Sequence, residues 1–173
     1  MSAQRLTRLK AEMAMMAKNP VPGIHCWLKE DSSDVISVEM DGPEGSPYES
    51  GVFSLEVVLS DRYPFTPPTV RFVTPVYHPN IDPNGRVCLS ALKPKPTGTW
   101  AVNLNIATVL GAIRILLSEP NLSDPLMTEI AKEYSEKFES YVSAARAQTL
   151  QHAKKTALNK KEHQPDAKKQ KLH

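Results

Sequence analysis

Residues 78–89, "HPNIDPNGRVCL", place a cysteine ten residues after a histidine, with an asparagine between them. A cysteine and a histidine at short range suit a nucleophile with its base, a metal site or a packed core. Cys88 follows the turn signal "DPNGR" instead of lying in an apolar run, which favours an accessible thiol. The spacing alone does not bring the ring of His78 to the sulfur. A cysteine nucleophile that needs no base therefore stays open beside the other readings.

Metal and disulfide chemistry have little support in the sequence. Cys26 and Cys88 are the only cysteines, and no C-x-x-C or H-x-x-x-H pattern supplies paired metal ligands. The first residues are charged and lack the apolar centre of a secretory signal, and no apolar run approaches the ~18 residues that span a bilayer. We therefore expect an intracellular protein with reduced thiols, no metal, no cofactor and no membrane partner.

Charge is spread unevenly along the chain. The net charge is +2, whereas residues 150–173 hold 7 Lys and 2 acidic residues, a net of +5. The rest is mildly acidic and has no basic recognition helix, which argues against direct nucleic-acid contact. The paired lysines of the tail are typical of a nuclear localisation signal or of a weak nucleic-acid contact, with a solvated extension as the alternative. We expect a nuclear protein, with the cytoplasm as a second location, and a tail disordered beyond about residue 158.

Hydrophobic periodicity predicts the elements that must position residues 78–89. The first is a helix that Ser2 caps and Asn19–Pro20 ends, and its apolar face consists of Leu6, Leu9, Met13 and Met16. Alternating apolar residues then predict strands over residues 21–30, 34–40, 52–60 and 70–73. The last of these follows a segment with three prolines, which cannot form a central strand. Short turns between the strands indicate an antiparallel meander.

Residues 74–102 show no sustained period, and so long a loop inside a compact domain indicates a functional segment. After it, "LNIATVLGAIRILLSEP" predicts a helix whose apolar face holds Val109, Leu110, Ile113, Leu116 and Leu117. Asp124 is a suitable cap for a further helix starting at Pro125, which continues as two helices or one broken helix. The fold class is α+β: an N-terminal helix, a four-stranded antiparallel meander, a long active-site loop and C-terminal helices.

Four motifs in register carry a resemblance to a known family. "YHPNI" is followed by Cys88 and then Trp100, "YPFTPPTVRF" precedes it and "SEPNLSDPL" follows. Over residues 3–150 this order resembles the ubiquitin-conjugating enzymes. The resemblance implies a catalytic core over residues 1–150, a basic extension over 151–173, and ubiquitin carried on Cys88 as a thioester. The partners that it implies are ubiquitin, a ubiquitin-activating enzyme, a RING ligase and a protein substrate lysine.

The resemblance also implies roles within the loop. Asn80 would stabilise the oxyanion of the tetrahedral intermediate, and Asp124 would orient the incoming lysine. Tyr77, His78 and Pro79 would hold the loop in shape. Local readings stay open beside these roles, since asparagine is a common turn residue and Asp124 is a suitable helix cap.

Partner surfaces follow from the same resemblance. It implies that the ligase and the activating enzyme bind the first helix and two loops, through Arg5, Arg8, Arg62, Pro64, Phe65 and Asn103. Phe65 beside prolines is expected to be an exposed apolar anchor, and inward packing is the alternative. The arginines have solvated surface charge as their alternative.

Within the family, "PGIHCW", "LNIATVLGAIRILLSEPNLSDPLM" and the basic tail resemble the T-type branch. That branch serves the Fanconi anaemia pathway of DNA-crosslink repair, which implies a FANCL-like ligase and site-specific monoubiquitination. It also implies self-ubiquitination at Lys93, five residues after Cys88. Two alternatives remain, namely a carrier of another ubiquitin-like modifier and a non-catalytic ubiquitin-binding scaffold, and the presence of Cys88 argues against the scaffold.

Overall fold

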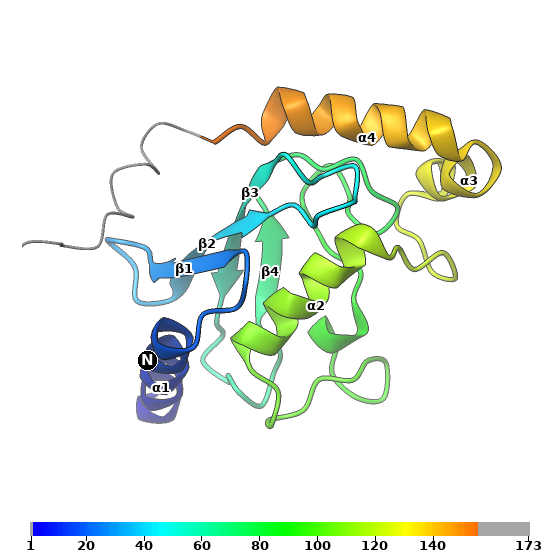
Figure 1. Ribbon diagram of the computed structural model, residues 1–173. Helices are drawn as coiled ribbons and strands as arrows, with labels where there is room; N and C mark the ends of the chain where they lie inside the picture. Colours follow the sequence, from blue (N-terminus) through cyan, green and yellow to red (C-terminus); the bar gives the residue numbers. More distant parts are fainter. Residues whose placement is uncertain (1, 156–173) are drawn as a thin grey trace, which may run out of the picture.

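A four-stranded antiparallel sheet organises the chain, and a computed structural model describes residues 2–155 (Figure 1). The predicted α+β class is confirmed, with one helix before the sheet and the others after it. The elements in chain order are α1 (Ala3–Lys18), β1 (Ile24–Leu28), β2 (Val35–Asp41), β3 (Val52–Val58), β4 (Thr69–Phe72), the short 3-10 helix η1 (Ser90–Leu92), α2 (Ile106–Ser118), α3 (Thr128–Glu136) and α4 (Phe138–His152).

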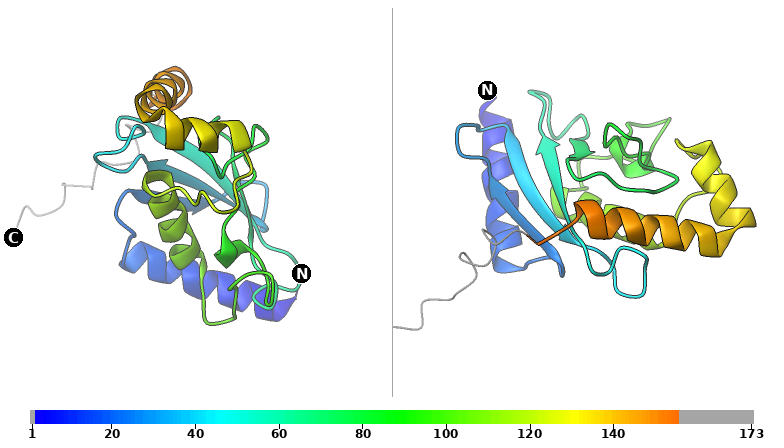
Figure 2. Two further views of the ribbon diagram at one scale, coloured as in Figure 1. Left: turned by 90° about the vertical axis from the view of Figure 1, so that its right-hand side faces the viewer. Right: turned by 90° about the horizontal axis from the view of Figure 1, so that it is seen from above.

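The strands pair in the order β1-β2-β3-β4, which confirms the predicted meander. Alternation in β2 buries one face of the sheet through Ile36, Val38 and Met40, while the residues between them are half-buried. Helix α2 lies across the buried face in Figures 1 and 2, and the predicted apolar face of this helix is buried throughout. The strands and α2 therefore share one core, and α2 supplies a rigid support beside the long loop.

Helix α1 has the predicted bounds, and the side chain of Ser2 accepts a hydrogen bond from the backbone N–H of Arg5. Leu9 is buried, and Met13 and Met16 pack against the core as expected. Arg5 and Glu12 are buried as well, at 4% exposure each, although the apolar pattern did not predict it. Charged side chains are rarely buried without partners, so these two require bonds from other segments.

The chain after α2 departs from one sequence prediction. Helix α3 begins at Thr128 with Met127 as its N-cap residue, so the prediction that Asp124 caps a helix starting at Pro125 is wrong. The reason is tertiary, because the backbone N–H groups of Leu126 and Met127 donate to the carbonyl oxygen of Pro79, at 3.0 and 2.9 Å. The predicted break in the last helical segment is confirmed, since α3 and α4 are separated at Lys137.

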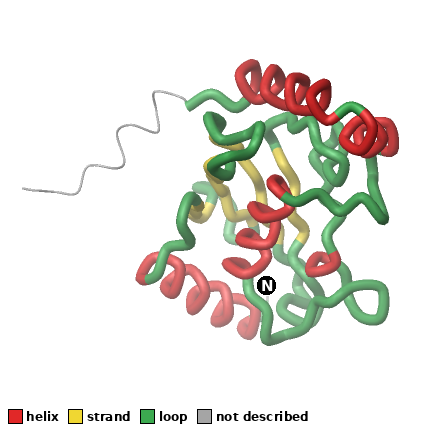
Figure 3. The backbone as a smooth tube through the Cα atoms, turned by 45° about the vertical axis from the view of Figure 1, so that its right-hand side comes forward, coloured by secondary structure: helices red, strands yellow, loops and turns green. Residues whose placement is uncertain are grey.

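The long irregular loop predicted over residues 74–102 is confirmed. It spans residues 73–105 and is interrupted only by η1 and isolated bridges (Figure 3). At the other end of the described chain, Ala153 is buried and its carbonyl oxygen accepts a hydrogen bond from the N–H of Val52 at 3.0 Å. Most of the predicted basic tail lies outside the described residues. Within residues 2–155, no helix is both long enough and apolar enough to cross a membrane.

Candidate active site

Cys88 is half-buried at the end of the turn over residues 82–87, between two groups of opposite charge. Lys93 Nζ lies 3.7 Å from Cys88 Sγ, and Asp124 Oδ2 lies 3.8 Å from the same sulfur. The backbone N–H of Cys88 donates to the carbonyl oxygen of Asn80 at 2.9 Å, which fixes the cysteine against the loop. The other cysteine differs, because burial raises the pKa of the Cys26 thiol to about 11. Cys88 is therefore the stronger candidate for a reactive thiol.

The turn before Cys88 is built around the carboxylate of Asp82. Its Oδ1 accepts the backbone N–H groups of Asn84 and Arg86, both at 2.9 Å, and its Oδ2 accepts Arg86 Nε at 2.6 Å. Burial opposes ionisation of Asp82, but the bonds from Arg86 outweigh it and hold the pKa of this carboxyl below its ordinary value. The carboxylate therefore sets the course of the chain that delivers Cys88.

Gly85 docks this turn onto the sheet. Its φ is +81°, and a side-chain carbon there would lie 1.9 Å from the carbonyl oxygen of Phe72 in β4. The N–H of Phe72 in turn donates to the carbonyl oxygen of Gly85 at 2.9 Å. Only glycine combines this conformation with so close an approach, so the "NG" of the turn ties the loop to the edge of the sheet.

His78 is completely buried and uses both ring nitrogens. Nδ1 accepts the backbone N–H of Asn80 at 3.0 Å, so the 2.7 Å contact to the carbonyl oxygen of Leu116 has Nε2–H as its donor. Burial lowers the pKa of His78 to about 4 despite the backbone hydrogen bonds, which favour the charged form. A neutral ring with no free nitrogen joins the loop to α2 and is unsuited to act as the base of a cysteine–histidine pair.

Asn80 joins two segments of the loop region through its side chain. Its Nδ2 donates to the carbonyl oxygen of Asn121 at 2.8 Å, and its Oδ1 accepts the backbone N–H of Asn121 at 2.9 Å. The local reading of Asn80 as a residue that holds the loop together is thus present in the geometry. Nδ2 carries a second hydrogen, and among the described residues it has no further acceptor.

Tyr77 and Pro79 link the same segment to the helices after it. The Tyr77 hydroxyl donates to Glu133 Oε2 in α3 at 2.5 Å, and the carbonyl oxygen of Tyr77 accepts the Tyr48 hydroxyl at 2.6 Å. Burial, with the bond to Glu133, raises the pKa of Tyr77 to about 12. The carbonyl oxygen of Pro79 holds residues 126–127, and the exposed Asp124 reaches the sulfur from the segment just before them.

The site thus presents a partly accessible thiol with a cation and a carboxylate beside it. Such a thiol suits acyl transfer, since it accepts an acyl group and later releases it to an amine held nearby. Across residues 2–155, no group of three His, Cys, Asp or Glu side chains is arranged to hold a metal ion. All polar side-chain atoms that are buried in this part of the chain have hydrogen-bond partners.

The residues expected to contact partners divide into two groups. Phe65 is 60% exposed, so its inward-packed alternative is wrong, and Arg62 and Asn103 are exposed as well. Arg5 is a correction, because it donates to the carbonyl oxygen of Leu59 at 3.0 Å and pairs with Asp34 and Asp61. A guanidinium engaged in this way is buried and has little surface to offer a partner.

Pro64 and Arg8 also differ from the expectation. Pro64 is buried, and its carbonyl oxygen accepts Trp100 Nε1 at 2.9 Å. Arg8 is half-buried and donates to backbone carbonyl oxygens of the chain before α2. Glu12, which accepts a bond from Arg8, was missed in the sequence analysis. The one signal that could have found it is the spacing of four residues between opposite charges on one helix.

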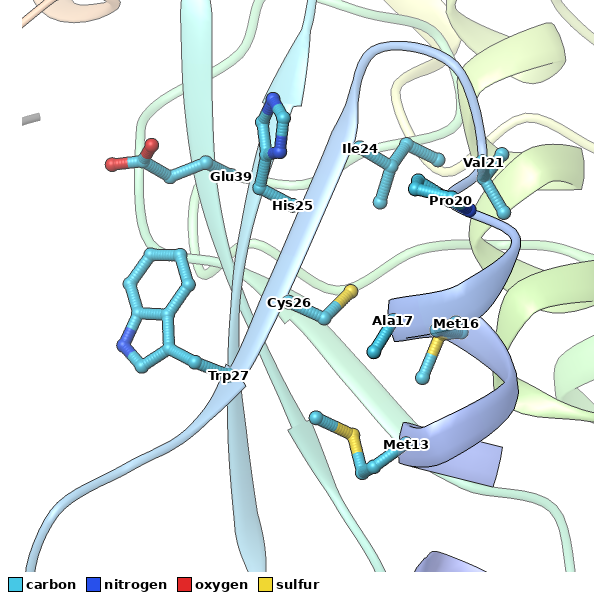
Figure 4. Close-up of a pocket in the computed structure, with 10 residues that line it drawn as sticks. All are labelled: Met13, Met16, Ala17, Pro20, Val21, Ile24, His25, Cys26, Trp27 and Glu39. Carbon is cyan, nitrogen blue, oxygen red and sulfur yellow. The ribbon is translucent and has the colours of Figure 1, made fainter. Parts of the chain in front are cut away.

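A groove of about 390 Å³ lies between the end of α1 and β1 (Figure 4). In Figure 4, Met13 and Cys26 face each other across it, and Trp27 lies on the other side of the strand. None of the predicted site residues is among those that line this groove: Met13, Met16, Ala17, Pro20, Val21, Ile24, His25, Cys26, Trp27 and Glu39. The candidate active site therefore lies at Cys88 and not in this groove.

Comparison with known proteins agrees with the geometry. Residues 8–149 match the family described as "Ubiquitin-conjugating enzyme". The chain is 50% identical over 151 residues to "Ubiquitin-conjugating enzyme E2 T" of Homo sapiens, with 87% of this chain and 77% of that protein covered. It is 48% identical over 150 residues to the Xenopus laevis protein of the same name, with 87% and 78% covered.

A second kind of relative is more distant. "Ubiquitin-conjugating enzyme E2 13" of Saccharomyces cerevisiae is 42% identical over 148 residues, with 86% of this chain and 94% of that protein covered. The family match spans most of the chain and includes the sheet, the long loop with Cys88, and α2. With its fold and site geometry, the chain belongs to the ubiquitin-conjugating enzyme family.

Proposed function

We propose that Cys88 receives ubiquitin as a thioester from a ubiquitin-activating enzyme and passes it to a substrate lysine with the help of a RING ligase. The observation that carries the proposal is the placement of the half-buried Cys88 sulfur, 3.7 Å from Lys93 Nζ and 3.8 Å from Asp124 Oδ2. A cationic and an acidic group beside one accessible thiol suit both halves of such a reaction.

The loading step is a transthioesterification, in which the acyl group moves from one thiol to another. The Cys88 thiolate attacks the carbonyl carbon of the thioester on the activating enzyme, and the sulfur of that enzyme leaves as a thiolate. ATP is consumed by the activating enzyme, and no cofactor is needed on this chain. In the second step a lysine amine attacks the thioester, the C–N bond forms, the C–S bond breaks, and the amine loses a proton while Cys88 is regenerated. A thioester is already a reactive acyl donor, so positioning contributes most of the rate enhancement.

Asn80 and Asp124 have separate roles in this proposal. The second Nδ2 hydrogen of Asn80 donates to the oxyanion of the tetrahedral intermediate, while the first keeps its bond to Asn121. Asp124 orients the incoming amine by accepting a hydrogen bond from it. Attraction alone would raise the pKa of that amine, so desolvation beside the thioester must favour its neutral, reactive form.

The ligase surface consists of Arg62, Phe65, Val102 and Asn103, all exposed on two loops. The two loops are neighbours, because Trp100 in one donates to the carbonyl oxygen of Pro64 in the other. Phe65, at 60% exposure, and Val102, at 47%, supply the apolar part, and Arg62 supplies a positive charge for an acidic patch on the ligase.

The finer proposal is site-specific monoubiquitination in DNA-crosslink repair with a FANCL-like ligase. Its basis is the resemblance of "PGIHCW" and of residues 104–127 to the T-type branch. We also propose that the protein acts in the nucleus, and this rests on the lysine pairs of the tail. Two of these pairs, at 160–161 and 168–169, lie outside the described residues.

A charging assay tests the carrier role. The protein is incubated with activating enzyme, ATP and ubiquitin, and the products are separated on non-reducing gels with and without thiol. A thiol-sensitive adduct is expected in wild type and in Cys26→Ser, the matched control. Cys88→Ser is expected to give no adduct or a thiol-resistant ester. Absence of a ubiquitin adduct in wild type would turn attention to another modifier, tested in the same way, or to a non-catalytic scaffold.

A discharge assay tests the ligase surface. A FANCL-like RING ligase is expected to accelerate transfer from wild type and to fail with Phe65→Ala, because the apolar anchor is lost. Phe138→Ala is the matched control, since Phe138 is also exposed, at 50%, but lies at the start of α4. Equal ligase stimulation of Phe65→Ala and wild type would remove Phe65 from the surface.

A further inference from the structure

The buried carboxylate of Glu12 receives hydrogen bonds from three parts of the chain. Arg8 Nε and the Tyr63 hydroxyl donate to Oε1, at 2.7 and 2.5 Å. The backbone N–H of Ile106, the first residue of α2, donates to Oε2 at 2.8 Å. Arg8 belongs to α1, Tyr63 to the chain between β3 and β4, and Ile106 follows the end of the long loop. One carboxylate therefore joins α1 to both loops of the ligase surface.

Arg8 extends this junction to the backbone of the second loop. Its Nη1 donates to the carbonyl oxygen of Val102 at 2.9 Å, and its Nη2 donates to that of Leu104 at 2.6 Å. With Nε bonded to Glu12, all three nitrogens of the guanidinium have partners. Arg8 thus fixes the chain beneath the exposed side chain of Val102.

Tyr63 transmits the same constraint to the first loop. Burial and the bond to Glu12 raise the pKa of the Tyr63 hydroxyl above its ordinary value, so it stays a donor. The Tyr63 ring lies 5.8 Å from the ring of Trp100, which also bonds to the carbonyl oxygen of Pro64. Residues 63–64 are therefore held from both sides, and Phe65 follows directly with its ring in solvent.

Stability alone does not account for this arrangement. Replacing a buried ionic network by apolar side chains of similar volume is often neutral or stabilising. What a fully bonded carboxylate contributes is geometry, because its donors must lie at fixed positions around it. A surface that is already fixed before a partner arrives loses less conformational freedom on binding.

We propose that Glu12 is a positioning residue for the RING ligase: its carboxylate holds Phe65 and Val102 in a fixed relation before the ligase binds. The proposal rests on the ligase surface of the proposed function. It assigns Glu12 no contact with the ligase and no part in the chemistry at Cys88. Ligase affinity and ligase-independent chemistry are therefore expected to respond differently when Glu12 is changed.

The test variant is Glu12→Gln, which keeps the size of the side chain and removes its charge. The apparent Kd for the RING ligase is expected to rise at least about fivefold as the surface loses its preorganisation. Hydrogen exchange of backbone amides in residues 62–66 and 101–106 is expected to become faster. Discharge of the preformed thioester to free lysine, which needs neither the ligase nor the activating enzyme, is expected to match wild type.

Glu56→Gln is the matched control. Glu56 also has two basic partners, Lys29 at 3.0 Å and Arg71 at 3.2 Å, but it lies in β3 away from both loops. Tyr63→Phe removes one hydroxyl and is expected to raise the Kd in the same direction. If Glu12→Gln does not fold, Tyr63→Phe and Arg8→Gln replace it as the variants that test the positioning role.

Two negative results are distinguishable. Wild-type ligase affinity in Glu12→Gln, or in the two substitute variants, would overturn the positioning role if Phe65→Ala still weakens binding. Wild-type affinity in Phe65→Ala would instead reject the ligase surface itself. A parallel loss of ligase-free discharge and of ligase affinity in Glu12→Gln would reduce Glu12 to a general stability role and also overturn the inference.

Discussion

The side-chain amide of Asn80 pairs with the backbone of Asn121 in both directions, donating at 2.8 Å and accepting at 2.9 Å. This pairing holds the segment before Asp124 against the segment before Cys88. Because the carboxylate and the sulfur come from segments 36 residues apart, their 3.8 Å contact depends on such cross-links. Loss of the Asn80 side chain is therefore expected to affect both stability and catalysis.

Asn80→Ala is expected to lower the free energy of unfolding by about 1 kcal/mol or more, because it removes two part-buried hydrogen bonds to the backbone of Asn121. Discharge of the thioester to free lysine is expected to slow about a hundredfold if Nδ2 also binds the oxyanion. Chemical denaturation and single-turnover discharge measure the two effects. Asn121→Ala is the control, since it loosens the Asn121–Ser123 turn but keeps the backbone groups that Asn80 binds. Equal slowing in both variants would attribute the effect to loop order alone.

Asp124→Asn is expected to slow discharge about tenfold or more near neutral pH, because the acceptor that orients the amine is weakened. The defect is expected to shrink as the pH approaches ~10, where free lysine loses its proton unaided. Thermal unfolding is expected to stay unchanged, since Asp124 is exposed and caps no helix. Discharge rates across pH, compared with those of the exposed control Asp31→Asn, measure the effect. A defect of constant size at all pH values would contradict a role in handling the amine.

The free energy of unfolding is expected to decrease as the pH is lowered, because of His78. Its pKa is about 4 in the folded protein and about 6.5 in the unfolded chain, so below pH 6.5 the unfolded state binds the extra proton. The contribution is fully present above pH 6.5, is lost as the pH falls from 6.5 to about 4, and changes little below pH 4. Between pH 7 and pH 5 the loss is expected to be about 2 kcal/mol.

Urea unfolding at pH 7 and pH 5 measures this loss. His78→Gln is expected to be less stable at pH 7, because the bond to Leu116 is disturbed, but to lose less on acidification. The pKa values of Asp82 and Glu133 are held below their ordinary range, so these carboxylates lose their contribution at lower pH. The prediction would be contradicted if the free energy of unfolding changed equally with pH in wild type and in His78→Gln.

Lys93 is expected to modify itself when no substrate is present. Its Nζ lies 3.7 Å from the sulfur that carries the proposed thioester, so the amine is already close to the carbonyl carbon. Wild-type protein that carries the ubiquitin thioester is expected to accumulate a thiol-resistant adduct, which peptide mass spectrometry locates at Lys93. Lys93→Arg is expected to stay in the thioester form, and Lys95→Arg, the control, to behave as wild type. Modification spread evenly over surface lysines would contradict the geometric explanation.

Gly85→Ala is expected to destabilise the protein by at least about 2 kcal/mol, because a side chain is strained at a positive φ and would meet the backbone of β4. Charging of Cys88 is expected to fall as well, since the same turn delivers the cysteine. Gly45→Ala is the control for the strain alone, as Gly45 also has a positive φ but nothing within 4 Å of the added carbon. Similar losses in the two variants would show that the contact with Phe72 is unimportant.

Local pattern predicted most of the fold. The alternation in β2 and the apolar face of α2 are properties of short segments, and both are confirmed. The predicted start of α3 was wrong because the carbonyl oxygen of Pro79, far away in the sequence, accepts hydrogen bonds from the N–H groups of residues 126–127. A capping residue followed by proline reports only local preference, so it cannot reveal a competing hydrogen bond from a distant residue.

The candidate site was less accessible to local reasoning. The turn before Cys88 favoured an accessible thiol, but Asn80 and Asp124 were singled out only by resemblance to the family. The burial of Arg5 and Glu12 could not be predicted, since their partners include Leu59 and Ile106, 54 and 94 residues away. Charged residues on an amphipathic helix look alike in sequence whether they meet water or a distant carbonyl.

The bond between Val52 and Ala153 decides where this protein can be cut or fused. Ala153 lies so close to Gly51 that a side-chain carbon added at Gly51 would be 2.9 Å from the Ala153 side chain. The end of α4 therefore packs against the chain that leads into β3. A truncation after residue 150 removes this packing and leaves the first N–H of β3 unpaired. A shortened chain or a fusion therefore keeps this bond only if the native sequence runs through Ala153.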